Sequence, residues 1–203
     1  MTSETPDHYF TAEPESKKNL GMIHTCLRGR SFEFLTATGV FSKKRVDLGT
    51  RLLIESMILP ESGYVLDVGC GYGAVGIAAA FFNPNLHVVM IDVNKRAVWL
   101  TKENIQRNKI NNAEVRVGHI YEPVTGGSFN SILSNPPVSA GMEIVREIVS
   151  EAPKYMANGA NFQIVVKSKV GKKTLRFFLE EAFGNVRILA RKSGYRVFLS
   201  EKQ

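Results

Sequence analysis

Cysteines and long apolar runs are both scarce in this sequence. Of its 203 residues only Cys26 and Cys70 are cysteine, and neither belongs to a CxxC spacing. This argues against a disulfide framework or a structural zinc site, so we expect two reduced, packed thiols and no metal. The longest nearly apolar run, residues 73–82, has ten residues, whereas a membrane-spanning helix needs about 20. We therefore expect no transmembrane helix and no membrane partner.

The first residues also lack the marks of a secretory signal. They read Met-Thr-Ser-Glu-Thr-Pro-Asp, with no basic start and no apolar stretch, so we expect a cytoplasmic protein. Hydrophobic residues make up 44% and charged residues 22%, which is ordinary for a soluble globular protein. A length of 203 residues is typical of one domain. We expect a single domain over residues 1–203, with an accessory layer or lid in residues 1–63 and a catalytic core in residues 64–203.

Acidic residues are scarce in the last part of the chain. Residues 160–203 contain 10 Lys and Arg against 3 Asp and Glu, whereas residues 1–159 contain 16 of each, so the formal charge of +7 arises entirely at the end. The basic residues concerned include Lys167, Lys169, Lys172, Lys173, Arg176, Arg187, Arg191, Lys192 and Arg196. Such a field attracts phosphate and neutralises a polyanion. A solvated helix face with protective edge-strand lysines is an open alternative.

From residue 64 onwards, short apolar strand patterns alternate with helical patterns. Strands are predicted at residues 64–68, 87–91, 114–117, 128–133 and 161–167, and helices at 74–82, 95–108, 142–156 and 172–183. Two final strands, 186–190 and 195–199, flank the tight turn Lys192-Ser193-Gly194. This order predicts an α/β, Rossmann-like fold whose seven-stranded sheet is mostly parallel and ends in an antiparallel hairpin.

The segment before residue 64 is predicted to form a small β layer and one helix. Residues 21–27 and 31–36 flank Arg28-Gly29-Arg30, as in a hairpin. Asp47 has the position of an N-cap for a helix that runs to Leu59, before Pro60.

Alternate glycines follow the first strand of the core. Gly69, Gly71 and Gly73 lie between that strand and a helix, where the backbone can approach a ligand closely, and this predicts a cofactor loop rather than an unliganded turn. Residues 71–76 also satisfy the G-x-G-x-x-G pattern of dinucleotide sites, and Asp92 falls near the ribose-binding acid of that motif. On this motif alone, NAD is an alternative.

Two acidic residues and the short remaining chain favour S-adenosylmethionine. Asp67 precedes the glycines and suits the methionine ammonium group, directly or through water. Asp92 ends the second strand and suits both ribose hydroxyls. About 125 residues follow the loop, too few for a second mononucleotide half and a substrate domain. For Asp92, an N-cap of the helix at 95–108 is the structural alternative.

A second motif, Asn135-Pro136-Pro137, follows the fourth predicted strand, at the sheet edge where open α/β folds bind ligands. The side-chain carbonyl of Asn135 and the backbone carbonyl of Asn135 or Pro136 can accept both N–H bonds of a planar amine, while the prolines fix the backbone. The amine lone pair then faces the sulfonium methyl group, and orientation contributes about 7–11 kcal/mol in favourable cases. Taken alone, the tripeptide is also a common turn.

Together these segments resemble the methyltransferase small domain family of class I S-adenosylmethionine-dependent methyltransferases. The resemblance rests on His8-Tyr9-Phe10, Gly39-Val40-Phe41-Ser42, Asp47-Leu48-Gly49-Thr50, Asp67 to Gly73, Asn135-Pro136-Pro137, Phe183-Gly184-Asn185-Val186 and Gly194-Tyr195-Arg196-Val197. The sequence is most similar to the ribosomal RNA small subunit methyltransferase C group and its short archaeal relatives. The resemblance implies the class I methyltransferase fold, S-adenosylmethionine as cofactor, and methylation of the exocyclic N2 amine of a guanine in ribosomal RNA.

The resemblance also implies residue roles. Cofactor-binding residues would be Asp67, Gly69, Gly71, Gly73, Asp92, Val93, His119, Ile120 and Asn135, and catalytic residues Asn135, Pro136 and Pro137. Substrate-binding residues would be Val138, Phe41, Lys167, Lys169, Lys172 and Arg196. Two positions depart from the family: His119 stands where an acid usually takes the adenine amino group, although a neutral imidazole can accept that bond. Val138 stands where an aromatic residue often stacks on the base, so Phe41, Phe10 or Tyr9 would replace that ring.

The partners implied are ribosomal RNA or the small ribosomal subunit. The bacterial enzyme of this resemblance has two related domains, so here substrate capture would fall to the basic C-terminal region, to residues 1–63 or to a second subunit, as in a homodimer. Two alternatives stay open because Asn-Pro-Pro serves any planar amine: methylation of a protein glutamine, or of adenine in DNA. A third is a non-catalytic RNA-binding assembly factor.

Overall fold

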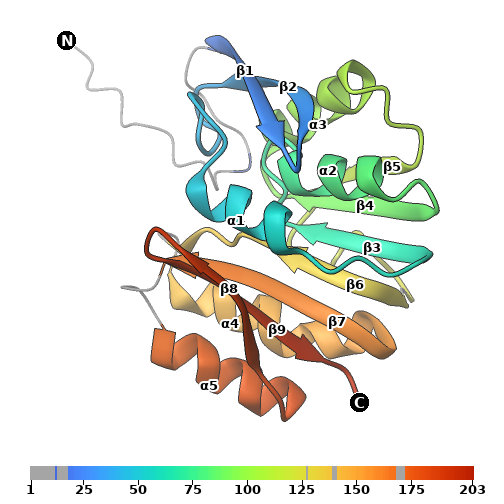
Figure 1. Cartoon of the computed structure of the whole chain (residues 1–203), viewed down its shortest axis with the longest axis vertical. Helices are drawn as coiled ribbons and strands as arrows, with labels where there is room; N and C mark the ends of the chain where they lie inside the picture. The colour runs from blue at the N-terminus through green and yellow to red at the C-terminus, as the bar shows by residue number, and fades with distance from the viewer. Residues whose placement is uncertain (1–11, 13–17, 127, 139–140, 168–171) are drawn as a thin grey trace.

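The structure is a computed structural model that describes residue 12 and residues 18–126, 128–138, 141–167 and 172–203. Within these residues the main feature is a seven-stranded sheet of order β5-β4-β3-β6-β7-β9-β8, beside a separate two-stranded sheet, β1-β2 (Figure 1). The strands are β1 Leu20–Leu27, β2 Arg30–Ala37, β3 Gly63–Val68, β4 Leu86–Asp92, β5 Ala113–Val117, β6 Phe129–Ser134, β7 Met156–Lys167, β8 Arg187–Lys192 and β9 Tyr195–Glu201. The helices are α1 Leu48–Ser56, α2 Ala74–Phe82, α3 Lys95–Arg107, α4 Met142–Glu151 and α5 Lys172–Phe183.

The strand directions confirm the predicted fold class. Strands β5, β4, β3, β6 and β7 are parallel, whereas β9 pairs antiparallel with both β7 and β8. The order reverses at β3, whose neighbours are β4 on one side and β6 on the other. A ligand cavity in an open α/β sheet is expected at the carboxyl ends of the strands beside this reversal.

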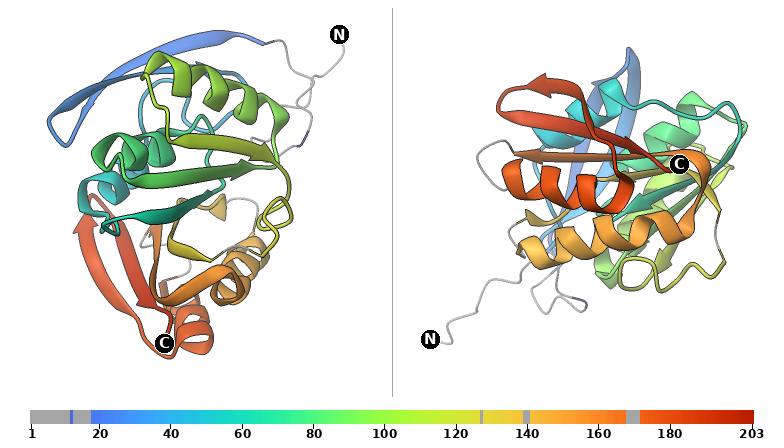
Figure 2. Two further views of the ribbon diagram at one scale, coloured as in Figure 1. Left: turned by 90° about the vertical axis from the view of Figure 1, so that its right-hand side faces the viewer. Right: turned by 90° about the horizontal axis from the view of Figure 1, so that it is seen from below.

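Helices cover both faces of the sheet, because adjacent residues of its central strands bury apolar side chains on opposite faces. Val65 and Val88 belong to one buried cluster, which includes side chains of α1, α2 and α3, whereas the adjacent Leu66 and Val89 belong to a second cluster with α4 and α5. Figure 2 shows α4 and α5 together on their side of the sheet. Strands buried on both faces are typical of parallel sheets.

Two predicted boundaries are wrong, and tertiary contacts explain the first. Helix α1 ends at Ser56 instead of Leu59, because the side-chain amide of Gln163 in β7 pairs with both backbone groups of Ile58, at 2.9 and 2.7 Å. Helix α4 ends at Glu151, where a 3-10 turn, Ala152–Tyr155, containing Pro153 takes over.

Two further differences concern a strand end and a cysteine. Strand β7 begins at Met156, earlier than the predicted residue 161. Both cysteines are free, but the prediction of packing is wrong for Cys26, which is exposed on β1, while Cys70 is buried. A strand of a two-stranded sheet has one face to the core and one to solvent, and Cys26 lies on the latter.

Asn104 joins the N-terminal hairpin to the core. This buried side chain in α3 accepts from the Leu35 backbone N–H at 2.6 Å and donates to the backbone carbonyls of Leu35 and Tyr72, at 3.0 and 2.8 Å. Tyr72 lies in the glycine loop, so one amide group fixes β2, α3 and that loop relative to each other.

We expect Asn104→Ala to lower the free energy of unfolding by about 3 kcal/mol, because three buried backbone groups lose their partner. Asn108 provides a matched control: its side chain makes the same paired contact with the Glu33 backbone, at 3.2 and 2.8 Å, in an exposed place. Since water can replace those bonds, Asn108→Ala should cost less than about 1 kcal/mol. Urea denaturation measures both, and equal losses would contradict the assignment.

Candidate active site

A cavity of about 300 Å³ opens at the carboxyl ends of β3, β4 and β6, where the strand order reverses. This volume is at the lower end of the range of about 300–1,000 Å³ that is common for small-molecule sites. The predicted cofactor and catalytic residues that line it are Asp67, Gly69, Gly71, Asp92, Val93, His119, Ile120, Asn135, Pro136 and Pro137. The fold therefore brings together residues that lie far apart in the sequence.

The glycine loop is held by hydrogen bonds to the end of β4. The backbone N–H groups of Gly69 and Cys70 donate to the Ile91 carbonyl at 2.9 and 3.0 Å. The Gly71 N–H donates to a carboxylate oxygen of Asp92 at 2.8 Å. Gly69 and Gly71 have φ values of 74° and 60°, and a Cβ atom at either would meet no atom within 4 Å. The space beside these two residues is therefore available to a ligand.

Gly73, which was also predicted to bind the cofactor, is outside the lining of the cavity. It is the N-cap of α2 with a φ of 91°. A Cβ atom there would lie 2.8 Å from Cγ2 of Thr101. Close packing of α2 against α3 therefore explains the glycine.

Asp67 carries a buried carboxyl group at the end of β3. One oxygen accepts from the Gly76 N–H at 2.8 Å. Glycine is needed at position 76, because a Cβ atom there would clash with the Met90 side chain. Burial raises the pKa of Asp67 to about 7; the Gly76 hydrogen bond opposes this and the charge of Asp92 adds to it. A cation bound beside Asp67 would favour its ionised form.

Asp92 is the second carboxyl group of the cavity. Besides Gly71, it accepts from the Asn94 N–H at 2.9 Å. Burial raises its pKa to about 6, opposed by these two backbone hydrogen bonds. The alternative that Asp92 caps α3 is wrong, because the cap is Asn94, which accepts from the N–H groups of Arg96 and Ala97. A carboxylate oxygen has further lone pairs, so Asp92 can also accept ribose hydroxyls.

Asn135 lies opposite, just after β6, and α1 orients it. Its amide nitrogen donates to the hydroxyl oxygen of Thr50 at 2.8 Å, which leaves the amide oxygen as the acceptor for a ligand. The Pro136 carbonyl accepts from the Val138 N–H at 2.9 Å and retains one lone pair. Thr50, which the sequence analysis did not select, also lines the cavity. Its only signal was its place in Asp47-Leu48-Gly49-Thr50.

The two positions that depart from the family differ in placement. His119 lines the cavity, and its Nε2 lies 3.2 Å from a carboxylate oxygen of Glu147 in α4. A carboxylate at Nε2 favours the proton on that nitrogen, which leaves Nδ1 as an acceptor. Val138 packs against the core of α4 and α5 and is outside the cavity lining, whereas Phe41 belongs to the lining. Phe10 and Tyr9 lie outside the described residues.

Of the predicted basic substrate residues, Lys167 and Arg196 do not line the cavity. Lys167 is exposed at the end of β7, and Arg196 is half-buried in β9. Lys169 and the side chain of Lys172 lie outside the described part of the chain. Several further lining residues were not selected from the sequence, among them Cys70, whose thiol pKa is raised well above its usual value by burial and by the charges of Asp92 and Asp67. That thiol is therefore neutral.

The described residues offer neither a metal site nor a membrane-spanning helix. Among the described residues, no group of three or more His, Cys, Asp or Glu side chains could hold a metal ion. No helix in that part of the chain is long and apolar enough to cross a bilayer.

The fold and this cavity define a class I methyltransferase architecture. The family model "Methyltransferase small domain" matches residues 31–199, so the chain belongs to the methyltransferase small domain family. This confirms the predicted family and its cofactor, S-adenosylmethionine. The buried Asp67, the partly exposed Asp92 and the open space beside Gly69 and Gly71 fit a ligand with an ammonium group and ribose hydroxyls.

Three similar proteins place the chain within the family. "Uncharacterized protein YbxB" of Bacillus subtilis is 38% identical over 97% of this chain and 98% of its own length. Ribosomal RNA small subunit methyltransferase C of Vibrio cholerae is 29% identical over 86% of this chain and 51% of its own length. A solved T. thermophilus 16S rRNA guanine N2 methyltransferase (RsmC), in complex with AdoMet and guanosine, is 26% identical over 94% of this chain and 52% of its own, with a TM-score of 0.81. The chain thus spans about half the length of these rRNA methyltransferases.

The raised pKa values make the stability of the ligand-free protein depend on pH. Between about pH 4 and the folded pKa values, of about 7 for Asp67 and about 6 for Asp92, the native protein holds protons that the unfolded chain has released. Stability therefore falls as pH rises through this window, by at most about 1.4 kcal/mol per pH unit and group. Asp67→Asn cannot ionise, so urea unfolding should show a smaller loss between about pH 5 and 8 than in wild type. An equal loss would contradict these pKa directions.

Proposed function

We propose that the protein transfers a methyl group from S-adenosylmethionine to the exocyclic N2 amine of a guanine in small-subunit ribosomal RNA. One observation carries the proposal. The Asn135 amide contacts Thr50 through its nitrogen, which leaves the amide oxygen for a ligand in the same cavity that Asp67 and Asp92 line. The similarity to the AdoMet and guanosine complex of the T. thermophilus enzyme supports the substrate.

The cofactor side of the cavity provides charge and shape. Asp67 would hold the ammonium group of the cofactor, and Asp92 its ribose hydroxyls, while Gly69 and Gly71 allow close approach of the backbone. Val93, His119 and Ile120 would surround the adenine. When bound, the cofactor supplies an electrophilic methyl group on a sulfonium.

The acceptor side orients the amine. The Asn135 amide oxygen would accept one N–H bond, and the Pro136 carbonyl or the Asn135 backbone carbonyl the other, while Pro136 and Pro137 hold the backbone rigid. An amine held in this way presents its lone pair towards the methyl group. The rate then depends on orientation and proximity, and the chain needs no nucleophilic side chain.

Labelled methyl transfer tests the proposal. S-adenosylmethionine carrying a labelled methyl group is incubated with small-subunit ribosomal RNA and, separately, with small subunits that lack the modification; the RNA is then digested to nucleosides. We expect the label in N2-methylguanosine, and Asn135→Ala to abolish it in protein that still binds the cofactor, as measured by calorimetry.

Other outcomes identify the alternatives. Label in a protein glutamine or in DNA adenine would contradict the RNA substrate and retain the methyltransferase chemistry. Cofactor binding without label in any acceptor would indicate an RNA-binding assembly factor.

Thr50 provides a further test of the acceptor side. Thr50→Val preserves the shape but removes the acceptor of the Asn135 amide, which can then rotate and present its nitrogen to the amine. We expect kcat to fall about tenfold, since one hydrogen bond contributes about 0.5–1.5 kcal/mol, while the Kd of the cofactor stays unchanged. Thr50→Ser retains the hydroxyl and should restore kcat. Equal kcat values in the Val and Ser variants would contradict this role.

A further inference from the structure

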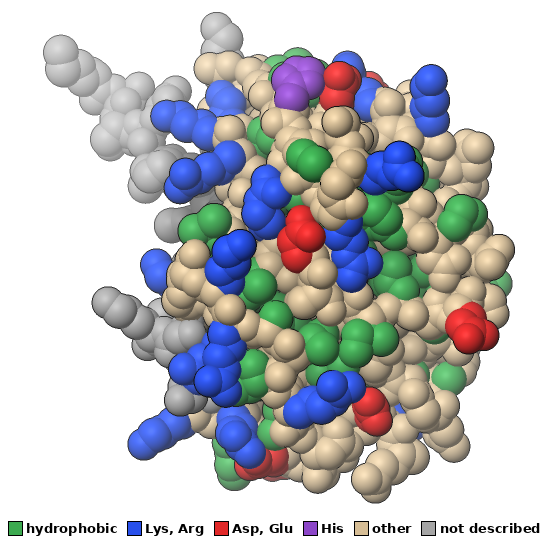
Figure 3. Space-filling view, in the orientation of Figure 1, with side chains coloured by type: hydrophobic (Ala, Val, Ile, Leu, Met, Phe, Trp, Pro, Cys, Tyr) green, Lys and Arg blue, Asp and Glu red, His purple; other side chains and the backbone are tan. Residues whose placement is uncertain are grey.

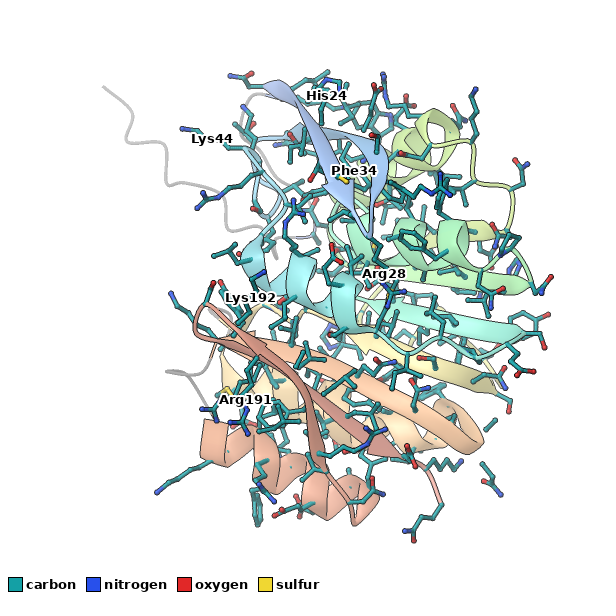
Figure 4. All side chains as sticks on the ribbon, viewed as in Figure 1. His24, Arg28, Phe34, Lys44, Arg191 and Lys192 are labelled. Carbon is teal, nitrogen blue, oxygen red and sulfur yellow. The ribbon has the colours of Figure 1, made fainter. Side chains whose placement is uncertain are left out.

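Five basic side chains from opposite ends of the chain lie on one side of the molecule, and we name them the basic strip. Its members are Lys44, Arg45, Arg191, Lys192 and Arg196. Figure 3 shows Lys and Arg side chains over the loop between β2 and α1 and over the turn between β8 and β9. Figure 4 labels Lys44, Lys192 and Arg191 along this side. The first two of the five precede α1, and the other three belong to β8 and β9.

One hydrogen bond joins the two halves of the strip. The Tyr195 hydroxyl donates to a carboxylate oxygen of Asp47 at 3.2 Å. Asp47 follows Arg45 by two residues, and Tyr195 precedes Arg196. Gly49 also lies against the Tyr195 ring, because a Cβ there would be 2.8 Å from it. The two segments are therefore in direct contact.

The first half lies in a loop that is fixed from several sides. Thr36, buried in β2, donates to the Lys43 carbonyl at 2.9 Å, and Asn94, the cap of α3, donates to the Gly39 carbonyl at 2.8 Å. Within the loop, the Ser42 hydroxyl donates to the Arg45 carbonyl at 2.7 Å. A charged ligand would therefore meet a backbone that needs little further ordering.

The second half places like charges opposite each other. Arg191 and Arg196 are directly paired across β8 and β9, beside a turn in which Ser193 and Gly194 have φ values of 49° and 79°. Like charges at such positions destabilise a hairpin. An anion bound between these guanidinium groups would offset that cost.

Ion pairs distinguish the strip from other basic residues of the protein. Four other basic residues pair with carboxylates: Arg116, Lys154, Arg176 and Arg187. Among the described residues, none of the five strip side chains has such an ion pair. Their charge is therefore available to an external anion.

The strip also adjoins the cavity. Phe41, from the same loop as Lys44 and Arg45, lines the cavity and is 36% exposed. Thr50, which contacts Asn135, lies in the first turn of the helix that begins just after Arg45. A nucleotide whose base enters the cavity would have its neighbouring phosphates within reach of this edge.

We propose that the basic strip binds the phosphates of single-stranded RNA on either side of the target base. The inference rests on the proposed function, which names RNA as the substrate. A single strand fits best, because its bases can be displaced from a stack and inserted into a cavity.

Fluorescence anisotropy with a labelled single-stranded RNA of about 16 nucleotides tests the proposal. The variants are Arg191→Gln with Lys192→Gln, and Lys44→Gln with Arg45→Gln. A matched control, Lys102→Gln with Arg107→Gln on α3, also removes one exposed lysine and one exposed arginine. Each strip variant should weaken RNA binding about tenfold at moderate salt and reduce the slope of log Kd against log salt by about 1.4, because about 0.7 is expected per phosphate contact.

The control variant should change neither quantity, and cofactor affinity should stay the same in all proteins. Strip variants that bind RNA no more weakly than the control would overturn the inference, even if wild-type protein methylates RNA. Wild-type protein that binds RNA through the strip but methylates only a protein glutamine would overturn the proposed function and support the strip. Wild-type protein without RNA affinity would overturn both.

Discussion

Two carboxyl groups at the ends of adjacent parallel strands impose the main constraint on this structure. The cavity raises the pKa values of both Asp67 and Asp92. Backbone N–H groups of Gly71, Gly76 and Asn94 donate to these carboxylates and stabilise their ionised forms. Glycine is needed at two of these donors, because one has a positive φ and the other lies against a neighbouring side chain. A cationic ligand completes the balance of charge, so the geometry of the loop and its ligand preference have the same physical origin.

The sequence predicts the fold and most of the residues of β3, β4 and the glycine loop that line the cavity, because these depend on local patterns. Strand and helix alternation, the glycine loop and the two acids at strand ends all lie within short segments. Helix ends are predicted less well, since a distant side chain such as Gln163 determines where α1 stops. The acceptor side includes a contact between Asn135 and Thr50, which are 85 residues apart. No pattern within a single segment encodes such a pair.

Charge counting shows the same limit. Residues 1–159 contain equal numbers of acidic and basic residues, so the basic residues before α1 attract no attention in the sequence. In the folded protein, the contact between Asp47 and Tyr195 brings the segment that contains Lys44 and Arg45 next to the hairpin of β8 and β9. The net charge of a sequence segment therefore does not predict where charges gather in the folded protein, and binding depends on the charges of the folded surface.

The contact between Tyr195 and Asp47 joins two residues that are 148 positions apart in the sequence, and it ties the start of α1 to the last hairpin. Helix α1 packs on β7, β8 and β9, so the final hairpin is part of the support for Thr50. Contacts between distant segments form late and slow the folding of a domain. The glycine loop and the two acids lie on other elements, whereas Thr50 lies on α1 and shares this support. The position of the Asn135 amide therefore depends on a hairpin that lies about 60 residues further along the chain.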